Sequence, residues 1–250
     1  MNFTFIREGP ALLVENESTS LVIADLHFGI ESEFSRRGIH IPSRSCERGE
    51  RAIRCAKETH PDRIILLGDV KHNVPLTSKQ EYYELPRILD NFRAIATLRI
   101  LPGNHDSGLE RFLNPEEILP ARGACIDGVG YLHGHTLPDP ALLGGLIILG
   151  HLHPIVALYD EVGCALRDAA YIAADLNEAC LLGKATVPGR TTRLLFMPAF
   201  NELSGYDLRS LAQSGPGPFS RCMNKDTAEI FLADGTYVGT FDSLASPPGA

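Results

Sequence analysis

The chain has 250 residues, of which 44% are hydrophobic and 22% charged, and its formal net charge is −8. These values are ordinary for a globular protein with one substantial core. The acidic balance argues against sequence-blind attraction to DNA or RNA, although it leaves room for a local basic groove. Because no apolar run approaches the ~20 residues of a membrane-spanning helix and no signal segment opens the chain, we expect a cytoplasmic protein without membrane contact.

Six cysteines are scattered along the chain, and none of them forms a Cys-x-x-Cys pair. Six cysteines allow three disulfides, but without a secretion signal we expect small buried thiols instead. They are Cys46, Cys55, Cys125, Cys164, Cys180 and Cys222.

The first part of the chain alternates predicted strands and helices. Short apolar runs predict strands, and an apolar stripe with i, i+3, i+4, i+7 spacing predicts helices. In chain order we expect strands over 3–7, 12–15 and 21–24, an irregular segment over 28–42, a helix over 43–59, a strand over 63–67, a helix over 78–95 that Pro86 kinks or splits, and a strand over 98–101.

Strands dominate the second part. A turn at Asp127-Gly128 predicts a hairpin of 124–126 with 129–132, and short β segments follow over 146–149 and 155–200. We expect a main domain over 1–212, a linker over 213–221, a C-terminal β-hairpin over 222–242 that packs on the core, and a frayed tail over 243–250. This order of elements predicts an α/β fold, namely a two-sheet α/β sandwich with helices on the outside.

Five short clusters of polar residues follow predicted strands. In chain order they are Asp25-Leu26-His27, Gly68-Asp69, Gly103-Asn104-His105-Asp106, His133-Gly134-His135 and Gly150-His151-Leu152-His153. An α/β protein builds its site where strands end at one edge of the sheet. Carboxylates mixed with imidazoles suit Mn²⁺, Fe or Zn²⁺ better than Ca²⁺. The pattern therefore predicts a metal-dependent hydrolase.

Spacing adds detail to two of these clusters. In a strand, residues i and i+2 point the same way, so we expect Asp25 and His27 to converge, and His151 and His153 as well unless the turn after Gly150 alters this. Asp69 is a lone acid beside a glycine, and we expect it to bridge two cations.

The five clusters resemble the calcineurin-like metallophosphoesterase superfamily, whose pattern is Asp-x-His, Gly-Asp, Gly-Asn-His-Asp/Glu, His and Gly-His-x-His. The match extends over about residues 12 to 200. The resemblance implies a catalytic domain over 1–212 that binds two divalent metal ions, with Mn²⁺ preferred and Fe or Zn²⁺ as alternatives.

The resemblance also implies a role for each residue. One metal would be held by Asp25, His27, Asp69 and His153, and the other by Asp69, Asn104, His133 and His151. His105 would stabilise the transition state or protonate the leaving oxygen, and Asp106 would orient its ring. His72 and His135 would lie behind the ligands or face substrate, or have only structural roles.

Further stretches narrow the resemblance to the SbcD-related phosphoesterases of archaea. These are the residues from Asp25 to Glu31, Gly68-Asp69-Val70-Lys71-His72, and Met197-Pro198-Ala199-Phe200-Asn201. Bacterial members of this group are associated with a ligase and a helicase in DNA repair operons, which makes repair or replication proteins expected partners. SbcD-like nucleases carry a sizeable domain after the catalytic core, whereas about fifty residues follow Phe200 here. We therefore expect no processive duplex exonuclease.

Basic residues before and within the helix over 43–59 suggest either a rail for phosphates or a solvated helix face. Glu47–Arg51 and Glu50–Arg54 would pair on the solvated face, which is the interpretation that we favour. The residues in question are Arg36, Arg37, Arg44, Arg48 and Arg51.

The sequence thus predicts a two-metal hydrolase that cleaves phosphodiester bonds by attack of a metal-bridging hydroxide. The expected substrate is a nucleotide or a single-stranded nucleic acid. One alternative is a phosphomonoesterase or nucleotide pyrophosphatase that acts on small molecules. Another is a non-catalytic accessory protein of DNA repair or replication, but all the expected ligands are present.

Overall fold

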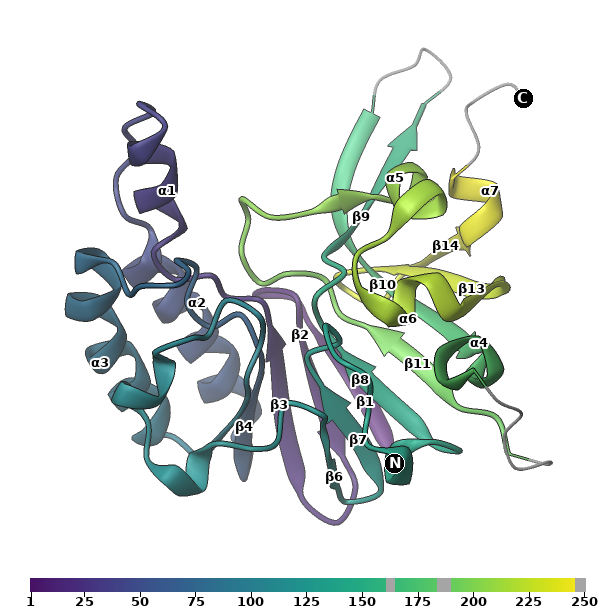
Figure 1. Ribbon diagram of the computed structural model, residues 1–250, viewed down its shortest axis with the longest axis horizontal. Coiled ribbons are helices and arrows are strands. Elements are labelled where there is room, and N and C mark those ends of the chain that lie inside the picture. The colour runs from purple at the N-terminus through teal and green to yellow at the C-terminus, as the bar shows by residue number, and fades with distance from the viewer. Residues whose placement is uncertain (161–164, 184–189, 246–250) are drawn as a thin grey trace.

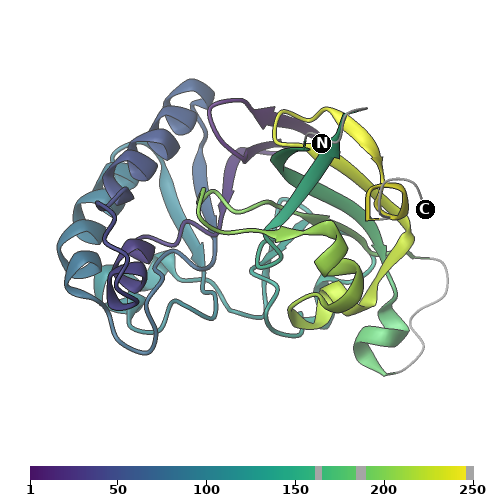
Figure 2. The same cartoon turned by 90° about the horizontal axis from the view of Figure 1, so that it is seen from above.

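The computed structural model describes residues 1–160, 165–183 and 190–245. Two β-sheets face each other and helices lie outside them (Figures 1 and 2), which confirms the predicted α/β sandwich. In the described part of the chain, no helix has both the length and the hydropathy needed to cross a bilayer.

The first sheet has the strand order β1-β2-β3-β4-β5. β3, β4 and β5 run parallel, so their carboxyl ends meet at one edge of the sheet. The strands are β1 (Asn2–Ile6), β2 (Ala11–Glu15), β3 (Thr19–Ala24), β4 (Arg63–Leu67) and β5 (Thr97–Leu101).

Strands β2, β3 and β4 of the first sheet are buried on both faces, which explains their apolar runs, whereas the edge strand β1 is mostly exposed. Alternate residues of β3 face opposite sides. Leu21 and Ile23 pack with the core beneath α2 (Ser45–Thr59) and α3 (Lys79–Arg93), whereas Val22 and Ala24 belong to the core between the two sheets.

The second sheet has the order β12-β9-β10-β11-β8-β7-β6, and β13 joins it by pairing with β10 and β14. β7, β8 and β11 run parallel, so this sheet also brings strand ends together. The strands are β6 (Ala124–Ile126), β7 (Val129–Leu132), β8 (Leu146–Leu149), β9 (Pro154–Tyr159), β10 (Ala165–Leu176), β11 (Arg193–Phe196), β12 (Tyr206–Asp207), β13 (Met223–Leu232) and β14 (Tyr237–Thr240).

Helices occupy three segments where we expected none. α1 (Ile30–Arg36) lies within the segment that we expected to be irregular, and it projects beyond α2 and α3 (Figure 1). α5 (Leu208–Ser214) and α6 (Gly217–Cys222) replace the expected linker over 213–221, because Leu211 and Phe219 bury their side chains in the core. α7 (Phe241–Ala245) occupies the start of the expected tail over 243–250, anchored by the buried Phe241, and residues 246–250 lie outside the described residues.

Two further expectations need correction. α3 is not split at Pro86, which lies inside it, and it starts at a capping box of Ser78 and Glu81. The expected short β segments over 155–200 are instead dominated by the long strand β10, which pairs with β9, β11 and β13. The short helix α4 (Glu178–Leu182) follows β10.

Cysteine pairing also differs from our expectation. Cys180 of α4 and Cys222 of α6 form a disulfide, because α4 and α6 pack against each other and bring the two residues within 5.5 Å, Cα to Cα. Cys55 is a buried thiol as expected, whereas Cys46 and Cys125 are exposed, and Cys164 lies outside the described residues.

Candidate metal centre and active site

The five polar clusters meet between the two sheets. Three of them follow β3, β4 and β5 of the first sheet, and two follow β7 and β8 of the second. Backbone contacts hold these ends together: the Met197 amide donates to Leu149 at the end of β8, and the Phe200 amide donates to Ala24 at the end of β3. The face-to-face packing of the sheets therefore brings together residues that are up to 128 positions apart, from Asp25 to His153.

Two groups of donor atoms share one carboxylate. Each residue of a group offers an atom within 4.8 Å of the others. The first group is Asp25, His27, Asp69 and His153, and the second is Asp69, His133 and His151. A third set with the same spacing, His27, His72 and His105, contains no carboxylate. The structure thus brings together residues that we predicted for each metal, and His151 and His153 fall into different groups although they are separated by one residue.

Short distances connect the two groups. Asp25 Oδ1 lies 3.0 Å from His153 Nε2 and 3.5 Å from His133 Nδ1. Asp69 contacts His27 Nε2 at 3.7 Å through Oδ2 and His133 Nε2 at 3.5 Å through Oδ1. Asn104, whose side chain is exposed, completes the second group, because its Oδ1 lies 3.2 Å from His133 Nε2.

Backbone conformation, and not strand alternation, brings Asp25 and His27 into one donor group and directs His151 and His153 into different groups. Asp25 and His27 follow the end of β3 and have φ values of 54° and 46°, while His151 and His153 follow β8 with 67° and 45°. Side chains other than glycine rarely adopt this left-handed region, and residues held in it cluster at functional sites. Our argument from the i, i+2 spacing of a strand was therefore wrong in its physical reason.

Glycines in the clusters make room for the donor side chains. A Cβ on Gly68 would lie 2.4 Å from His133 Nδ1, and one on Gly103 would lie 2.1 Å from Asp69 Oδ1. A Cβ on Gly150 would lie 2.6 Å from Asp25 Oδ2. Gly68, Gly103 and Gly150 are thus required by close approach between two clusters.

The donor atoms fit divalent cations. His27 Nε2 is buried and has no hydrogen-bond partner among the described residues, and the buried atoms Asp25 Oδ1 and His153 Nε2 lie 3.0 Å apart without forming a well-aligned hydrogen bond. Buried polar atoms left without a partner are costly, and a cation that accepted their lone pairs would satisfy them. His133 is already oriented for this purpose, because its Nδ1 lies 3.0 Å from the Leu67 carbonyl and leaves Nε2 toward Asp69.

Burial and neighbouring charges set the protonation states. Burial, reinforced by the positive charge that His133 can carry, lowers the pKa of His151 to about 3. Burial likewise holds the pKa of His27 well below its ordinary value. Burial opposes ionisation of Asp25, but the surrounding imidazoles outweigh it and lower the pKa of its carboxyl group. Neutral His27 and His151 beside an ionised Asp25 are the forms that bind metal.

His105 lies beside the donor groups and is not part of either. Its amide donates to Asp69 Oδ1 at 2.9 Å, and its Nδ1 contacts the carbonyl of His72. Because a carbonyl only accepts, Nδ1 carries a proton and Nε2 remains for substrate.

Asp106 does not orient the His105 ring as expected. Its carboxylate accepts from the amides of Lys71, at 3.1 Å, and Gly103, at 2.8 Å, because its side chain turns back toward the strand ends. Burial and the nearby charge of Asp69 raise the pKa of Asp106 to about 6. Asp106 therefore ties the two loops together, and the His72 carbonyl orients His105.

The other predicted histidines lie at the two sides of the donor groups. His72 contacts His27, with 3.1 Å between their Nδ1 atoms, and its Nε2 meets the carboxylate of Glu33. His135 lies beside the second group, with its ring 5.2 Å from that of His133 and 6.2 Å from that of His151, centroid to centroid.

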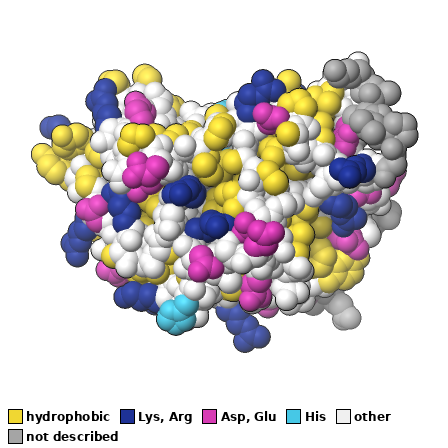
Figure 3. Space-filling model, turned by 90° about the horizontal axis from the view of Figure 1, so that it is seen from below, with side chains coloured by type: hydrophobic (Ala, Val, Ile, Leu, Met, Phe, Trp, Pro, Cys, Tyr) yellow, Lys and Arg dark blue, Asp and Glu magenta, His cyan; other side chains and the backbone are white. Residues whose placement is uncertain are grey.

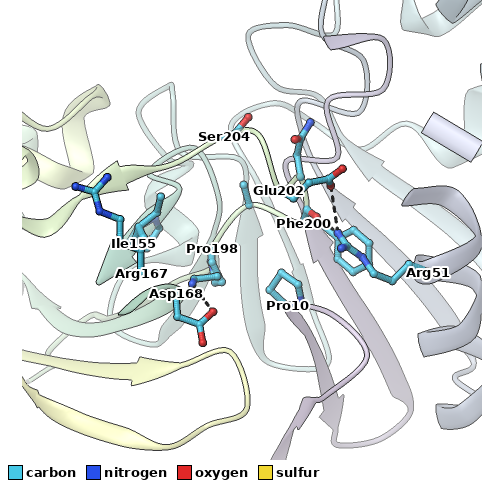
Figure 4. Close-up of a pocket in the computed structure, with 13 residues that line it drawn as sticks. Pro10, Arg51, Ile155, Arg167, Asp168, Pro198, Phe200, Glu202 and Ser204 are labelled. Carbon is cyan, nitrogen blue, oxygen red and sulfur yellow. Dashed lines mark hydrogen bonds and ion pairs between the residues drawn. The ribbon is translucent and has the colours of Figure 1, made fainter. Parts of the chain in front are cut away.

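Within the helix, Arg48 and Arg51 are held by contacts inside the protein and do not form a solvated face. Arg48 is buried and pairs with Glu31 and Glu202, at 3.0 Å and 3.2 Å. Figure 4 shows Arg51 against the Phe200 ring, and its guanidinium lies 3.6 Å from Glu202 rather than pairing with Glu47 in the described structure. Arg54 pairs with Glu8 instead of Glu50. The face of α2 that carries Arg48 and Arg51 packs on residues 198–204, which explains why Arg51 does not form the predicted pair with Glu47.

The remaining arginines of this set also have acidic or polar partners. Arg44 pairs with Glu47 and Glu202, Arg37 with Glu33, and Arg36 with the Asn73 side chain. Arg37 remains 72% exposed, so it is still accessible beside His72.

Sequence reasoning missed two carboxylates that support the site. Glu33 contacts His72, and Glu81 accepts from the amides of His72, at 2.9 Å, and Asn73, at 2.7 Å. Glu33 is 39 residues from His72, and Glu81 follows His72 by nine residues on the next helix, so neither separation is a recognisable spacing. Glu81 is fully buried, and its place three residues after Ser78 is the one available hint, since a capping box predicts a helix start there.

Comparisons with known proteins identify the family of this chain. The model of the family described as calcineurin-like phosphoesterase matches residues 19–162. Among solved structures, the nuclease MPE of Pseudomonas putida is 15% identical, with a TM-score of 0.54 over 93% of this chain and 98% of its own. The phosphoesterase Yfce of E. coli is 13% identical, with a TM-score of 0.37 over 88% of this chain and 96% of its own.

No curated protein matches the chain. At 15% identity the nuclease shows a common fold, and the family match extends over more than half of the sequence. The family match and the donor groups at the strand ends lead to one conclusion: this chain belongs to the calcineurin-like phosphoesterase family and is a metal-dependent hydrolase.

Proposed function

We propose that this protein is a two-metal hydrolase that cleaves phosphodiester bonds in nucleotides or short single-stranded nucleic acids. The observation that carries the proposal is the pair of donor groups that meet on Asp69. A carboxylate shared by two such groups suits a pair of cations, and two-metal sites of this kind recur in phosphatases and nucleases.

Seven residues would hold the ions. Asp25, His27, Asp69 and His153 would bind one, and Asp69, Asn104, His133 and His151 the other. Mixed imidazole and oxygen donors favour Mn²⁺, with Fe and Zn²⁺ as alternatives. When bound, two divalent cations would polarise the phosphoryl oxygens and acidify a water molecule for attack at neutral pH.

The side chains of this chain would complete the chemistry. Asp25 and Asp69 neutralise only part of the charge of two divalent cations, so the site attracts an anionic phosphate. His105 directs Nε2 away from its bond to the His72 carbonyl, and in the imidazolium form, with a proton on both ring nitrogens, it can donate the Nε2 proton to the leaving oxygen. Because no side chain serves as a nucleophile in this proposal, no covalent enzyme intermediate forms.

Two features favour a diester over a monoester. The structural neighbour from Pseudomonas putida is named a nuclease. Arg36, the last residue of α1, contacts Asn73, and Arg37, which follows α1, contacts Glu33, so both lie next to neighbours of His72 and can contact a phosphate next to the scissile one.

The test is a substrate panel with the metal-free protein supplied with Mn²⁺, Zn²⁺, Fe²⁺ or Mg²⁺ in turn. We expect a bis-aryl phosphate and short single-stranded oligonucleotides to be hydrolysed with Mn²⁺, and a mono-aryl phosphate to react more slowly. The protein kept in chelator is the control. Faster hydrolysis of the mono-aryl phosphate would contradict the diester assignment, and equal rates in chelator would contradict the metal-dependent one.

A further inference from the structure

The ring of His72 lies between a proposed metal ligand and a carboxylate. Its Nδ1 is 3.1 Å from Nδ1 of His27, and its Nε2 contacts Oε2 of Glu33 on α1. The side chain of His72 is 11% exposed and that of Glu33 is 34% exposed, so the contact lies at the edge of the buried site. These three side chains form a continuous chain that ends at the first donor group.

Only one arrangement of protons fits this chain of contacts. Within the described part of the chain His27 Nε2 has no hydrogen-bond partner, and it lies 3.7 Å from Asp69 Oδ2, so it is the nitrogen available to a cation. A neutral imidazole that gives Nε2 to a cation carries its proton on Nδ1. That proton is donated to His72 Nδ1, which must then be bare. His72 consequently carries its own proton on Nε2 and donates it to Glu33.

The backbone around His72 is held in place independently of this chain. The His72 and Asn73 amides both donate to the buried Glu81, and the His72 carbonyl accepts from His105 Nδ1. Removing the Glu33 carboxylate would therefore free the His72 ring to rotate or change tautomer while its backbone stays in position.

We propose that Glu33 and His72 are positioning residues that fix the tautomer and ring orientation of His27 as a metal ligand. The proposal rests on the metal assignment in the proposed function. Partners that hold the second nitrogen of a ligating histidine typically contribute 10–100-fold in metal affinity or activity. Here the Glu33 carboxylate, which lies on α1, would act on His27 through the intervening His72.

The first experiment titrates metal-free protein with Mn²⁺ by calorimetry. We expect wild type to bind two ions, and Glu33→Ala and His72→Ala to lose about 10–100-fold in affinity at one site while the other site is unchanged. Glu33→Gln should recover most of the loss, because an amide oxygen still accepts the His72 proton. Glu47→Ala removes an equally negative but 68% exposed side chain from α2, and it should match wild type.

The second experiment observes the ring protons by NMR with Zn²⁺ bound, which is diamagnetic. We expect His27 in its Nδ1–H form and His72 in its Nε2–H form in wild type and in Glu33→Gln, and a loss of the single His72 tautomer in Glu33→Ala. Thermal unfolding of each variant checks that α1 and the core remain folded. A substitution that only destabilised α1 would lower the unfolding temperature without changing the tautomer of His72 alone.

The outcomes separate this proposal from the one that it rests on. If wild type binds two ions and both Glu33→Ala and His72→Ala keep wild-type affinity and tautomers, the positioning role is wrong and the proposed function stands. If wild type binds a third ion that His72→Ala abolishes, His72 is itself a ligand together with His27 and His105, and the positioning role of Glu33 and His72 is wrong. If wild type binds no ion, both proposals fail.

Discussion

Asp69 connects more parts of the site than its place in a two-residue motif suggests. Its carboxylate belongs to both donor groups and also accepts the His105 amide at 2.9 Å. Its backbone has a φ of 45°, in the left-handed region where non-glycine residues are strained by about 1–3 kcal/mol. Gly103 gives the side chain its space, so one carboxylate joins the ends of β4 and β5.

Replacing Asp69 should therefore remove metal as well as activity. We expect Asp69→Ala to bind fewer than two ions and to lose hydrolysis, because both donor groups lose their common oxygen ligand. Metal analysis of the purified variant and its turnover of a bis-aryl phosphate check this. Asp90→Ala, which removes a 71% exposed carboxylate from α3, is the matched control. Two bound ions with wild-type turnover would refute the bridging assignment.

His105 should affect turnover without affecting metal content. We expect His105→Ala to retain its ions and to lose about 10²–10⁴-fold in rate on substrates with poor leaving groups. The loss should shrink for a nitrophenolate leaving group, which needs no proton. Kinetics on a matched pair of aryl and alkyl diesters measure the difference, with the exposed His40→Ala as a control. An equal loss on both substrates would argue against proton donation.

At the scale of elements, the start of α3 is joined to the active-site loop. The Ser78 hydroxyl accepts the Glu81 amide at 3.2 Å, while the Glu81 carboxylate accepts the amides of Ser78, His72 and Asn73. The same carboxylate thus caps a helix and holds the loop that carries His72. Stability and site geometry are coupled through it.

Two substitutions at this cap should separate stability from site geometry. We expect Ser78→Ala to lower the free energy of unfolding by about 1 kcal/mol and to leave Mn²⁺ affinity unchanged. Glu81→Ala should cost about 1–3 kcal/mol more and weaken Mn²⁺ binding, because it leaves buried amides without a partner. Denaturant titrations and calorimetry measure both. A Glu81→Ala protein no less stable than Ser78→Ala would contradict this coupling.

The disulfide between α4 and α6 gives a second prediction for elements. Cys180 and Cys222 are separated by 42 residues, and the chain-entropy relation assigns a loop of that length about 4 kcal/mol. We expect the Cys180→Ser, Cys222→Ser double variant, and wild type in reductant, to lose stability of this order in denaturant titrations. Cys46→Ser, which removes an exposed thiol, should match wild type. Unchanged stability of the double variant would contradict this prediction.

At the scale of the whole molecule, charge limits the choice of substrate. The chain carries a net charge of −8, and the face in Figure 3 shows acidic and basic side chains intermixed without a continuous basic tract. Most arginines near the site already contact acidic groups, as Arg48 and Arg51 do with Glu202. A long duplex needs many phosphate contacts along its backbone.

We therefore expect short, single-stranded or small phosphodiesters to be cleaved in preference to long duplex DNA. Nucleic-acid binding should be weak and should fall steeply with salt, because it depends on a few exposed cations such as Arg37. Cleavage of matched single-stranded, duplex and bis-aryl substrates at two salt concentrations tests this. The bis-aryl ester is the control, since it has no polyanionic backbone. Efficient duplex cleavage that persists at high salt would refute the prediction.

The sequence alone determined the fold class and the set of candidate donor residues. Strands such as β3, β4 and β8 are continuous apolar runs of few residues, and hydrophobic pattern identifies such runs. The clusters directly follow these strands, so the residue types themselves indicated metal chemistry. Local sequence patterns gave the wrong secondary structure where burial in the core determines it. In α6, burial of Phe219 stabilises a helix in a segment rich in glycine and proline.

Only the tertiary structure decided how these residues work together. The left-handed conformations of Asp25 and His153, the sharing of Asp69 between two groups, and the space that Gly150 leaves for Asp25 depend on contacts between distant strand ends. Glu33 and Glu81 reach His72 from two helices, and no spacing in the chain encodes that meeting. Sequence periodicity describes which face of an element is buried, whereas the packing of the sheets and helices fixes which side chains meet.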